Sequence, residues 1–280
     1  MVTTNLNYML ITANPEIAQY AEQAGVHRIF IDMEVLGKFE RQGHLNTHRA
    51  CHTFTDISNV RSVLARAELM VRLNPLYDGS ANEVDRALDH GAQRLMLPMF
   101  RSRGEVCHFL DLVDGRAPVT FLTETPQAFA RLPSYLNDLG PEDHIHIGLN
   151  DLSLGMGLDF LFEPVAAGLL DPMAILFEKK NIIWGFGGIA SIGTGTLPAE
   201  LVLNEHIRLG STWVILSRAF HQDSYTLEEL KERINLPAEL DRLTTTATSL
   251  QRAQQDTLVK NHHQFVTKTF ELVANKNLVA

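Results

Sequence analysis

The chain has 280 residues, of which 45% are hydrophobic and 20% are charged. A chain of this length and apolar content can bury a large core, which excludes a disordered protein and predicts one large globular domain, with or without a small appendage. The net charge is −9, from 24 Lys+Arg and 33 Asp+Glu, and the basic residues are scattered. Binding to a nucleic-acid backbone is therefore not expected.

Cysteine content and the apolar runs indicate the compartment. Cys51 and Cys107 belong to no CxxC pair and cannot build a disulfide framework, which favours a reducing environment. The longest apolar runs have the length of strands, and the opening MVTTNLNYML lacks the charged start and long apolar stretch of a signal peptide. We therefore expect a cytoplasmic protein without a membrane span.

Short runs rich in Ile, Val, Leu and Phe alternate with helix-like segments along the chain, as expected for strands buried on both faces of a parallel sheet. The predicted strands are residues 8–13, 28–33, 69–73, 94–98, 119–123, 144–148, 182–186 and 212–217. Helix starts are predicted at Asn14-Pro15-Glu16, from Asp56 and at Thr125-Pro126. Two more are predicted as capping boxes, at Ser80 with Glu83 and at Ser102 with Glu105. Eight such alternations predict an α/β fold of the (β/α)8 TIM barrel type.

Two segments depart from the repeat. Residues 37–55 form a long, His-rich connection, which we interpret as a functional loop or lid. His44, His48 and His52 recur there at a spacing of four, which would align them on one helix face. Such a face is usually solvated or packed, and the functional alternatives are that one histidine transfers a proton from the lid or that the three bind a metal.

From Thr226 onward the chain is expected to be helical. We predict a catalytic barrel over residues 1–222 and a helical extension over 223–280, whose last amphipathic stretch either packs on the barrel or forms an oligomer contact.

In a β/α barrel the active site is built at the carboxyl ends of the strands. Polar residues and glycines selected by this position are Asp32, Glu34, Arg72, Asn74, Glu124, Asp151, Gly187 and Gly188. Charges at the ends of apolar strands are costly unless they pair with a metal, a ligand or one another. These residues are therefore the candidate site.

Glu124 and Asp151 follow neighbouring predicted strands, so their carboxylates should lie within reach of one metal ion. Mg²⁺ suits that arrangement, because it takes one or two protein carboxylates and leaves positions for water and substrate oxygens. The alternative is that the two carboxylates cap the helices that follow them.

Arg72 lies between apolar residues on the third predicted strand. Its planar guanidinium suits a substrate carboxylate or a developing enolate oxygen. An ion pair with Asp32 or Glu34 is the alternative, and both roles can coexist. No lysine occurs between Lys38 and Lys179 or between Lys180 and Lys231, which excludes a Schiff-base aldolase with its lysine on a barrel strand.

Gly187 and Gly188 follow the seventh predicted strand and open a glycine-rich stretch. Loops at this place in the fold often bind phosphate through backbone N–H groups. The glycines would equally give a substrate room or simply form the turn.

These motifs together resemble the HpcH/HpaI aldolase and citrate lyase β-subunit family of pyruvate/phosphoenolpyruvate-type barrels, over about residues 29–220. The resemblance rests on IDME at 31–34, VRLNP at 71–75, LMLP at 95–98, TET at 123–125 and IGLNDLS at 147–153. It implies that Glu124 and Asp151 bind Mg²⁺ or Mn²⁺ and that Arg72 binds the keto-acid or acyl oxygen. Independently of the resemblance, the place of Asn74, Gly187 and Gly188 at strand ends predicts that they contact the substrate.

The implied activity is that of a class II type aldolase or carbon–carbon lyase, which acts on a 2-keto acid or acyl-thioester through a metal-stabilised enolate. Asp32 or Glu34 would orient a metal-bound water or serve as a proton relay. Aldolase members have a histidine where this chain has Val35, and citrate-lyase-like members often have Pro-Lys where it has Pro98-Met99, which indicates a divergent branch.

Two alternatives remain open at this stage. A barrel without the family's general base would serve as a non-catalytic or regulatory ligand-binding subunit. The glycine-rich stretch alone would also suit a metal-free phosphosugar isomerase or epimerase. The family resemblance and the C-terminal helices lead us to expect a homo-oligomer.

Overall fold

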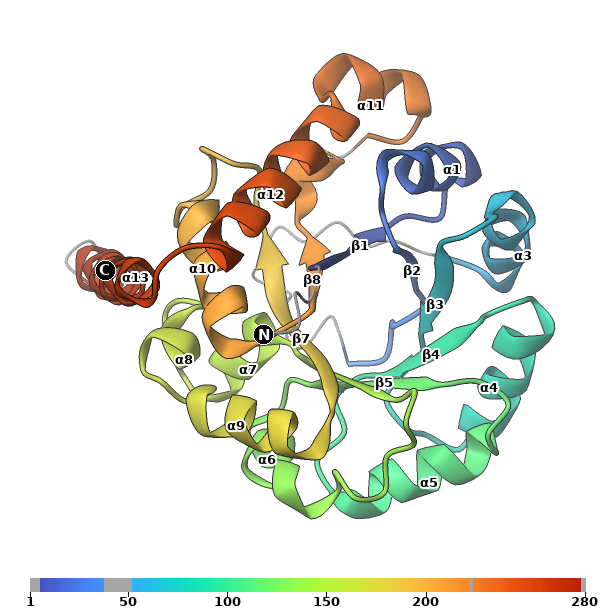
Figure 1. The fold of residues 1–280 in the computed structure, drawn as a ribbon. Coiled ribbons are helices and arrows are strands. Elements are labelled where there is room, and N and C mark those ends of the chain that lie inside the picture. The colour runs from blue at the N-terminus through green and yellow to red at the C-terminus, as the bar shows by residue number, and fades with distance from the viewer. Residues whose placement is uncertain (1–5, 38–51, 222–223, 278–280) are drawn as a thin grey trace.

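A computed structural model describes residues 6–37, 52–221 and 224–277. Eight parallel strands close into a barrel in the order of the sequence, which confirms the predicted TIM barrel (Figure 1). The strands are β1 (Asn7–Ile11), β2 (Arg28–Asp32), β3 (Glu68–Arg72), β4 (Arg94–Leu97), β5 (Val119–Thr123), β6 (His144–Ile147), β7 (Ile183–Ile189) and β8 (Trp213–Leu216).

Helices surround the barrel and cover the outer face of the sheet (Figure 1). They are α1 (Pro15–Ala24), α3 (Phe54–Val63), α4 (Ser80–Asp89), α5 (Arg103–Val113), α6 (Pro126–Ala130), α7 (Leu149–Gly155), α8 (Glu163–Ala166), α9 (Asp171–Lys180), α10 (Ala199–Leu209), α11 (Leu227–Arg233), α12 (Leu236–Gln251) and α13 (Gln255–Asn277). Short 3₁₀ helices lie at Leu132–Ser134 and Arg218–Phe220. The large core lies between sheet and helices, and a small one fills the barrel with Met9, Phe30, Met70, Met96 and Leu122.

Most helix starts follow the predicted capping residues. The side chains of Asn14, Ser102 and Thr125 accept backbone hydrogen bonds at the starts of α1, α5 and α6. Helix α3 begins at Phe54, before the predicted Asp56, because Thr53 and Asp56 form a capping box.

The predicted capping box of Ser80 and Glu83 is wrong. Ser80 is the first residue of α4, and its hydroxyl accepts from the backbone N–H of Tyr77. The Glu83 carboxylate accepts from Asn74 instead of closing the helix end.

Strand β7 is longer than predicted and carries two of the candidate site residues. It runs to Ile189, so Gly187 and Gly188 lie inside the strand and not in a loop after it. The pairing of β7 with β8 is irregular between Gly185 and Gly188. A Cβ on Gly185 would lie 2.2 Å from the Trp213 carbonyl oxygen, so this irregular pairing requires glycine.

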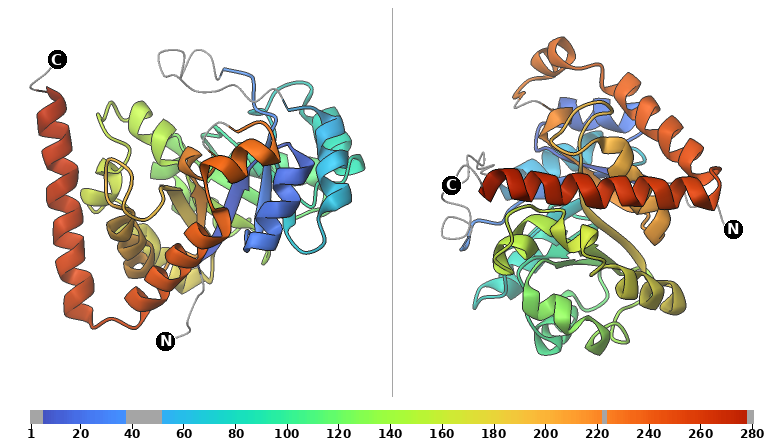
Figure 2. Two further views of the ribbon diagram at one scale, coloured as in Figure 1. Left: turned by 90° about the horizontal axis from the view of Figure 1, so that it is seen from above. Right: turned by 90° about the vertical axis from the view of Figure 1, so that its left-hand side faces the viewer.

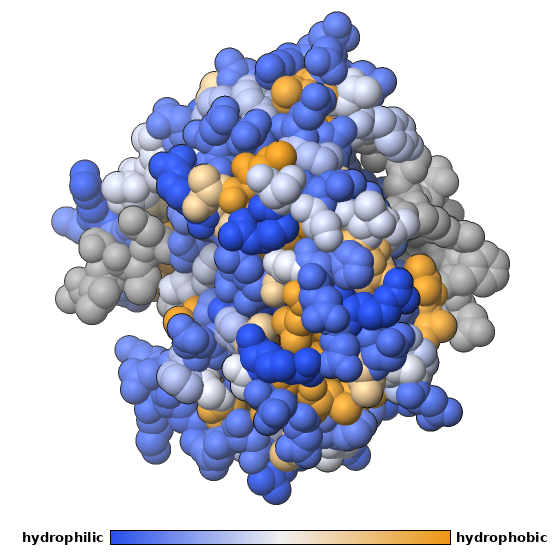
Figure 3. All heavy atoms as spheres, turned by 90° about the vertical axis from the view of Figure 1, so that its right-hand side faces the viewer, coloured by the Kyte–Doolittle hydropathy of each residue, from blue (hydrophilic) through white to orange (hydrophobic). Residues whose placement is uncertain are grey.

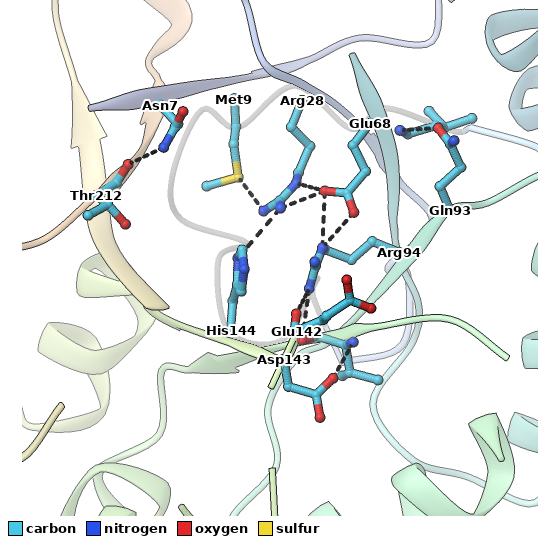
Figure 4. A network of polar contacts seen from close by, with 12 residues as sticks. Asn7, Met9, Arg28, Glu68, Gln93, Arg94, Glu142, Asp143, His144 and Thr212 are labelled. Carbon is cyan, nitrogen blue, oxygen red and sulfur yellow. Dashed lines mark hydrogen bonds and ion pairs between the residues drawn. The ribbon is translucent and has the colours of Figure 1, made fainter. Parts of the chain in front are cut away.

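A polar network fills the barrel at the amino ends of the strands (Figure 4). Glu68 accepts from Arg28 Nε at 2.6 Å and from Arg94 Nε at 3.0 Å, and the Arg28 guanidinium lies 3.8 Å from the centre of the Trp213 ring. Burial and the two arginines lower the pKa of His144, which keeps its ring neutral. This network closes the base of the barrel, the end associated with stability in this fold.

The C-terminal segment is helical, as predicted, and it packs against the barrel. Helix α13 lies along α10 and α8 (Figure 2). The buried Glu205 on α10 accepts from His262 Nδ1 at 3.0 Å, and Phe265 is fully buried. These contacts support the packing role, and the oligomer contact stays a prediction. In the described part of the chain, no helix is long and apolar enough to cross a membrane.

The buried histidines make folding stability depend on pH. His206 on α10 stacks on Phe186 with ring centres 3.9 Å apart, and its Nδ1 bonds the Ser211 hydroxyl at 2.8 Å. Burial lowers the pKa of His206 to about 3. The unfolded chain therefore binds a proton here below its ordinary pKa of 6.5, and stability is lost as the pH falls through that value.

We predict that the free energy of unfolding of H206F falls less steeply with decreasing pH than that of the unmodified protein. Below pH 6 the two slopes should differ by up to about 1.4 kcal/mol per pH unit. Urea titrations at pH 7.5, 6 and 5 measure the difference. The matched control is H108Q, on the exposed face of α5. An H206F profile parallel to that of the unmodified protein contradicts the assignment.

Candidate active site

An ion pair between neighbouring strands lies at the carboxyl end of the barrel. Asp32 and Arg72 are register partners on β2 and β3. Arg72 donates from Nε to Asp32 Oδ1 at 2.8 Å and from Nη2 to Oδ2 at 2.7 Å, and its Nε lies 3.5 Å from Glu34 Oε2. The structure thus brings together three of the predicted residues, as a bidentate, largely buried pair of Arg72 with Asp32 and a second ion pair of Arg72 with Glu34.

The charges around Arg72 hold it in its ionised form. Burial alone lowers the pKa of a guanidinium, but Asp32, Glu34 and Glu124 together raise the pKa of Arg72 above its ordinary value. The predicted substrate role and the ion pair are compatible, because Asp32 accepts from Nε and Nη2. Among the hydrogen bonds between described residues, Nη1 of Arg72 is the nitrogen that remains for a further acceptor.

Glu124 follows β5 and is buried at the same end of the barrel. Its Oε1 accepts from the Met99 backbone N–H at 3.1 Å. Burial raises the pKa of Glu124 to about 8, Arg72 opposes this rise, and the nearby charges of Asp151 and Glu34 add to it. The charge of Asp151, the other predicted metal ligand, therefore acts on the ionisation of Glu124.

The capping alternative fails for Glu124. Helix α6 is capped by the Thr125 hydroxyl, which accepts from the Ala128 backbone N–H at 3.0 Å. Asp151 lies in the first turn of α7, where its negative charge also favours the positive end of the helix dipole. The helical role of Asp151 and a ligand role are compatible.

Gly148 makes room for the Glu124 carboxylate. A Cβ at position 148 would lie 2.7 Å from Glu124 Cβ and 2.9 Å from Oε2. Such distances require a neighbouring atom to move. The sequence analysis gave Gly148 no role of its own. Its position, between the end of β6 and the helix that carries Asp151, could have marked it as a site residue.

Asn74 connects the end of β3 to the loop that carries Glu34. Its Oδ1 accepts from the backbone N–H groups of Val35 and Leu36, each at 2.9 Å, and its Nδ2 donates to Glu83 Oε1 at 2.6 Å. Both ends of the amide are thereby used within the protein. This geometry favours a positioning role, and the predicted substrate contact stays a prediction.

Gly187 and Gly188 reach the site as part of β7. The His146 ring bonds the Gly187 carbonyl from Nε2 at 3.3 Å, and burial lowers the pKa of His146 to about 4. The nearest atom to a Cβ on Gly188 would be the Ile215 carbonyl oxygen at 3.5 Å, so its surroundings are open. Their predicted contacts with substrate or phosphate are still predictions.

One histidine of the long connection is near the site. The Asp32 backbone N–H donates to His52 Nδ1 at 2.9 Å. His44 and His48 lie outside the described residues.

The donor set for a metal consists of carboxylates. The described residues contain no group of three or more His, Cys, Asp or Glu side chains arranged around one point. Mg²⁺ commonly uses one or two protein carboxylates and completes its shell with water and substrate oxygens. Glu124 and Asp151 fit that mode of binding.

The comparisons agree with the fold. No family model and no curated protein matches the sequence. An HpcH/HpaI aldolase from Desulfitobacterium hafniense DCB-2 is 16% identical, with 90% of this chain and 95% of that chain covered and a TM-score of 0.58.

An HpcH/HpaI aldolase/citrate lyase family protein from Burkholderia cenocepacia J2315 is 15% identical, covering 89% of this chain and 96% of that one with a TM-score of 0.59. These similarities show that the chain has the barrel fold that the motif resemblance implied.

We predict that D32A lowers the unfolding free energy by about 3 kcal/mol, because it leaves the Arg72 charge buried without its bidentate partner. D85A is the matched control, since Asp85 pairs with Arg116 at 2.7 Å but both side chains are about half exposed, at 56% and 44%. Its loss should stay below about 1 kcal/mol. Equal losses in urea titrations would show that the Arg72 pair is not a stability element.

Proposed function

We propose that this chain is a divergent member of the HpcH/HpaI aldolase and citrate lyase β-subunit family, and that it makes or breaks a carbon–carbon bond next to a 2-keto acid or acyl-thioester with the help of a divalent metal ion. The observation that carries the proposal is the cluster of Asp32, Glu34, Arg72 and Glu124 at the carboxyl ends of β2, β3 and β5. It occupies the catalytic end of the barrel, in a fold shared with structures from that family.

Glu124 and Asp151 would hold Mg²⁺ or Mn²⁺. Both are hard oxygen donors, the charge of Asp151 helps to raise the pKa of Glu124, and a glycine at position 148 leaves room for the Glu124 carboxylate. A bound divalent ion supplies a Lewis acid that stabilises negative charge as it develops on a substrate oxygen.

Arg72 would bind the carboxylate or carbonyl oxygen of the substrate. The bidentate pair with Asp32 fixes the plane of the guanidinium, so Nη1 points in a defined direction. Glu34 and Asp32 are the carboxylates that would hold or move a proton there. The barrel strands contain no lysine, so a Schiff-base route through a strand residue is excluded.

We predict that the protein exchanges the methyl protons of pyruvate with solvent deuterium in the presence of Mg²⁺ or Mn²⁺, and that E124Q and D151A lose this exchange at least about 100-fold. NMR follows the exchange, with oxaloacetate decarboxylation measured in parallel. D85N is the control for loss of an exposed carboxylate.

Exchange that survives a chelator, or that persists in E124Q, contradicts the metal-dependent proposal. Metal binding without exchange of pyruvate protons points instead to an acyl-thioester substrate or to a regulatory barrel.

We further predict that G148A weakens Mn²⁺ binding by about ten-fold or more, because the added methyl group displaces the Glu124 carboxylate. Titration followed by electron paramagnetic resonance measures the free ion directly. The control is G104A on α5, where the nearest atom to the new Cβ is 3.8 Å away. Unchanged Mn²⁺ affinity in folded G148A would remove Glu124 from the metal site.

A further inference from the structure

Two apolar side chains are exposed immediately beside the charged cluster. Val35 is 59% exposed and Leu36 is 43% exposed, whereas Glu34, the residue before them, is 2% exposed. The Glu34 carboxylate is 3.5 Å from Arg72 Nε, and consecutive Cα atoms are only about 3.8 Å apart. The chain therefore passes within one or two residues from a buried charge to an apolar surface at the mouth of the site.

The backbone under these side chains is fixed. Asn74 Oδ1 accepts from the N–H groups of both Val35 and Leu36, and Asn74 is itself 8% exposed. Glu83, which is 5% exposed, accepts from Asn74 Nδ2 at 2.6 Å. An apolar surface held in place in this way loses little conformational entropy when a ligand binds.

The neighbouring loop carries a third exposed apolar group. Tyr77 lies three residues after Asn74 and is 45% exposed. Its backbone N–H donates to the Ser80 hydroxyl at 2.9 Å, and its ring covers Gly79, where a Cβ would lie 2.4 Å from Tyr77 Cε2. Figure 3 shows apolar side chains at the surface of the flank that carries α3 and α4.

We propose that Val35 and Leu36, which we call the rim, bind an alkyl or aryl group on the carbonyl fragment that the enzyme joins to, or releases from, its keto acid. This inference rests on the proposed function. The keto-acid half carries a carboxylate and is matched by Arg72, whereas the rim side chains offer an apolar surface and no charge. They therefore suit the other half of the substrate, which makes the enzyme selective for apolar acceptors.

The test compares the addition of pyruvate to hexanal and to glyceraldehyde, with Mg²⁺ present. The unmodified protein should prefer hexanal in kcat/KM, and V35S/L36S should lower the hexanal value about ten-fold while glyceraldehyde addition and pyruvate proton exchange stay within about two-fold. I175S is the matched control, because Ile175 on α9 is an exposed apolar residue at 69% exposure.

The outcomes separate the two proposals. Absence of metal-dependent pyruvate exchange in the unmodified protein overturns the proposed function, and the rim proposal with it. Exchange without a preference for hexanal, or an equal loss with both aldehydes in V35S/L36S, overturns the rim proposal alone. A change of oligomeric state in V35S/L36S, measured by light scattering, also overturns it, because the rim is then a subunit contact.

Discussion

The bidentate pair of Arg72 with Asp32 is the interaction on which the arrangement of the site depends. It joins β2 to β3 at their last paired residues, and its charge is shared with Glu34 and Glu124. A guanidinium buried at this depth requires carboxylates around it, and carboxylates buried at this depth require the guanidinium. Because burial of either charge alone is unfavourable, the ion pair keeps the ends of β2 and β3 together, with the Glu34 and Glu124 carboxylates close enough to influence Arg72.

The two ends of the barrel combine arginine and carboxylate side chains in different ways. At the base, one carboxylate, Glu68, accepts from two guanidinium groups, those of Arg28 and Arg94. At the mouth, the described ion pairs join one guanidinium, that of Arg72, to two carboxylates, and two further acids lie near them. Trp213 and the buried arginines close the base, so it serves stability. Glu124 and Asp151 at the mouth supply carboxylate oxygens, which Mg²⁺ prefers as ligands, and active sites of this fold lie at that end, so we assign the proposed chemistry to it.

The sequence predicted the barrel and most of the charged cluster because both follow from strand position. Residues at strand ends converge in a parallel barrel, so the sequence alone predicted that Arg72, Asp32 and Glu124 lie at the same end of the barrel. The end of β7 was missed because Gly187 and Gly188 have no apolar side chains to continue the pattern, and irregular pairing depends on contacts with Trp213. The role of Glu83 was predicted wrongly because a serine three residues earlier has the spacing of a capping box. The actual partner of Glu83, Asn74, lies on the segment after β3 and comes within hydrogen-bond distance only in the folded chain.

Asn74 shows how one buried amide can define two surfaces of different chemistry. By accepting two successive N–H groups, it fixes a turn in which Glu34 faces inward and Val35 and Leu36 face outward. The cost is a second buried acid, since burial raises the pKa of Glu83 while its bonds to Asn74 lower it. A loop serving only as a connection would gain nothing from that cost. The same Asn74 contacts therefore direct the Glu34 carboxylate toward Arg72 and the Val35 and Leu36 side chains toward solvent. A ligand with a charged half and an apolar half would have both halves positioned by this turn.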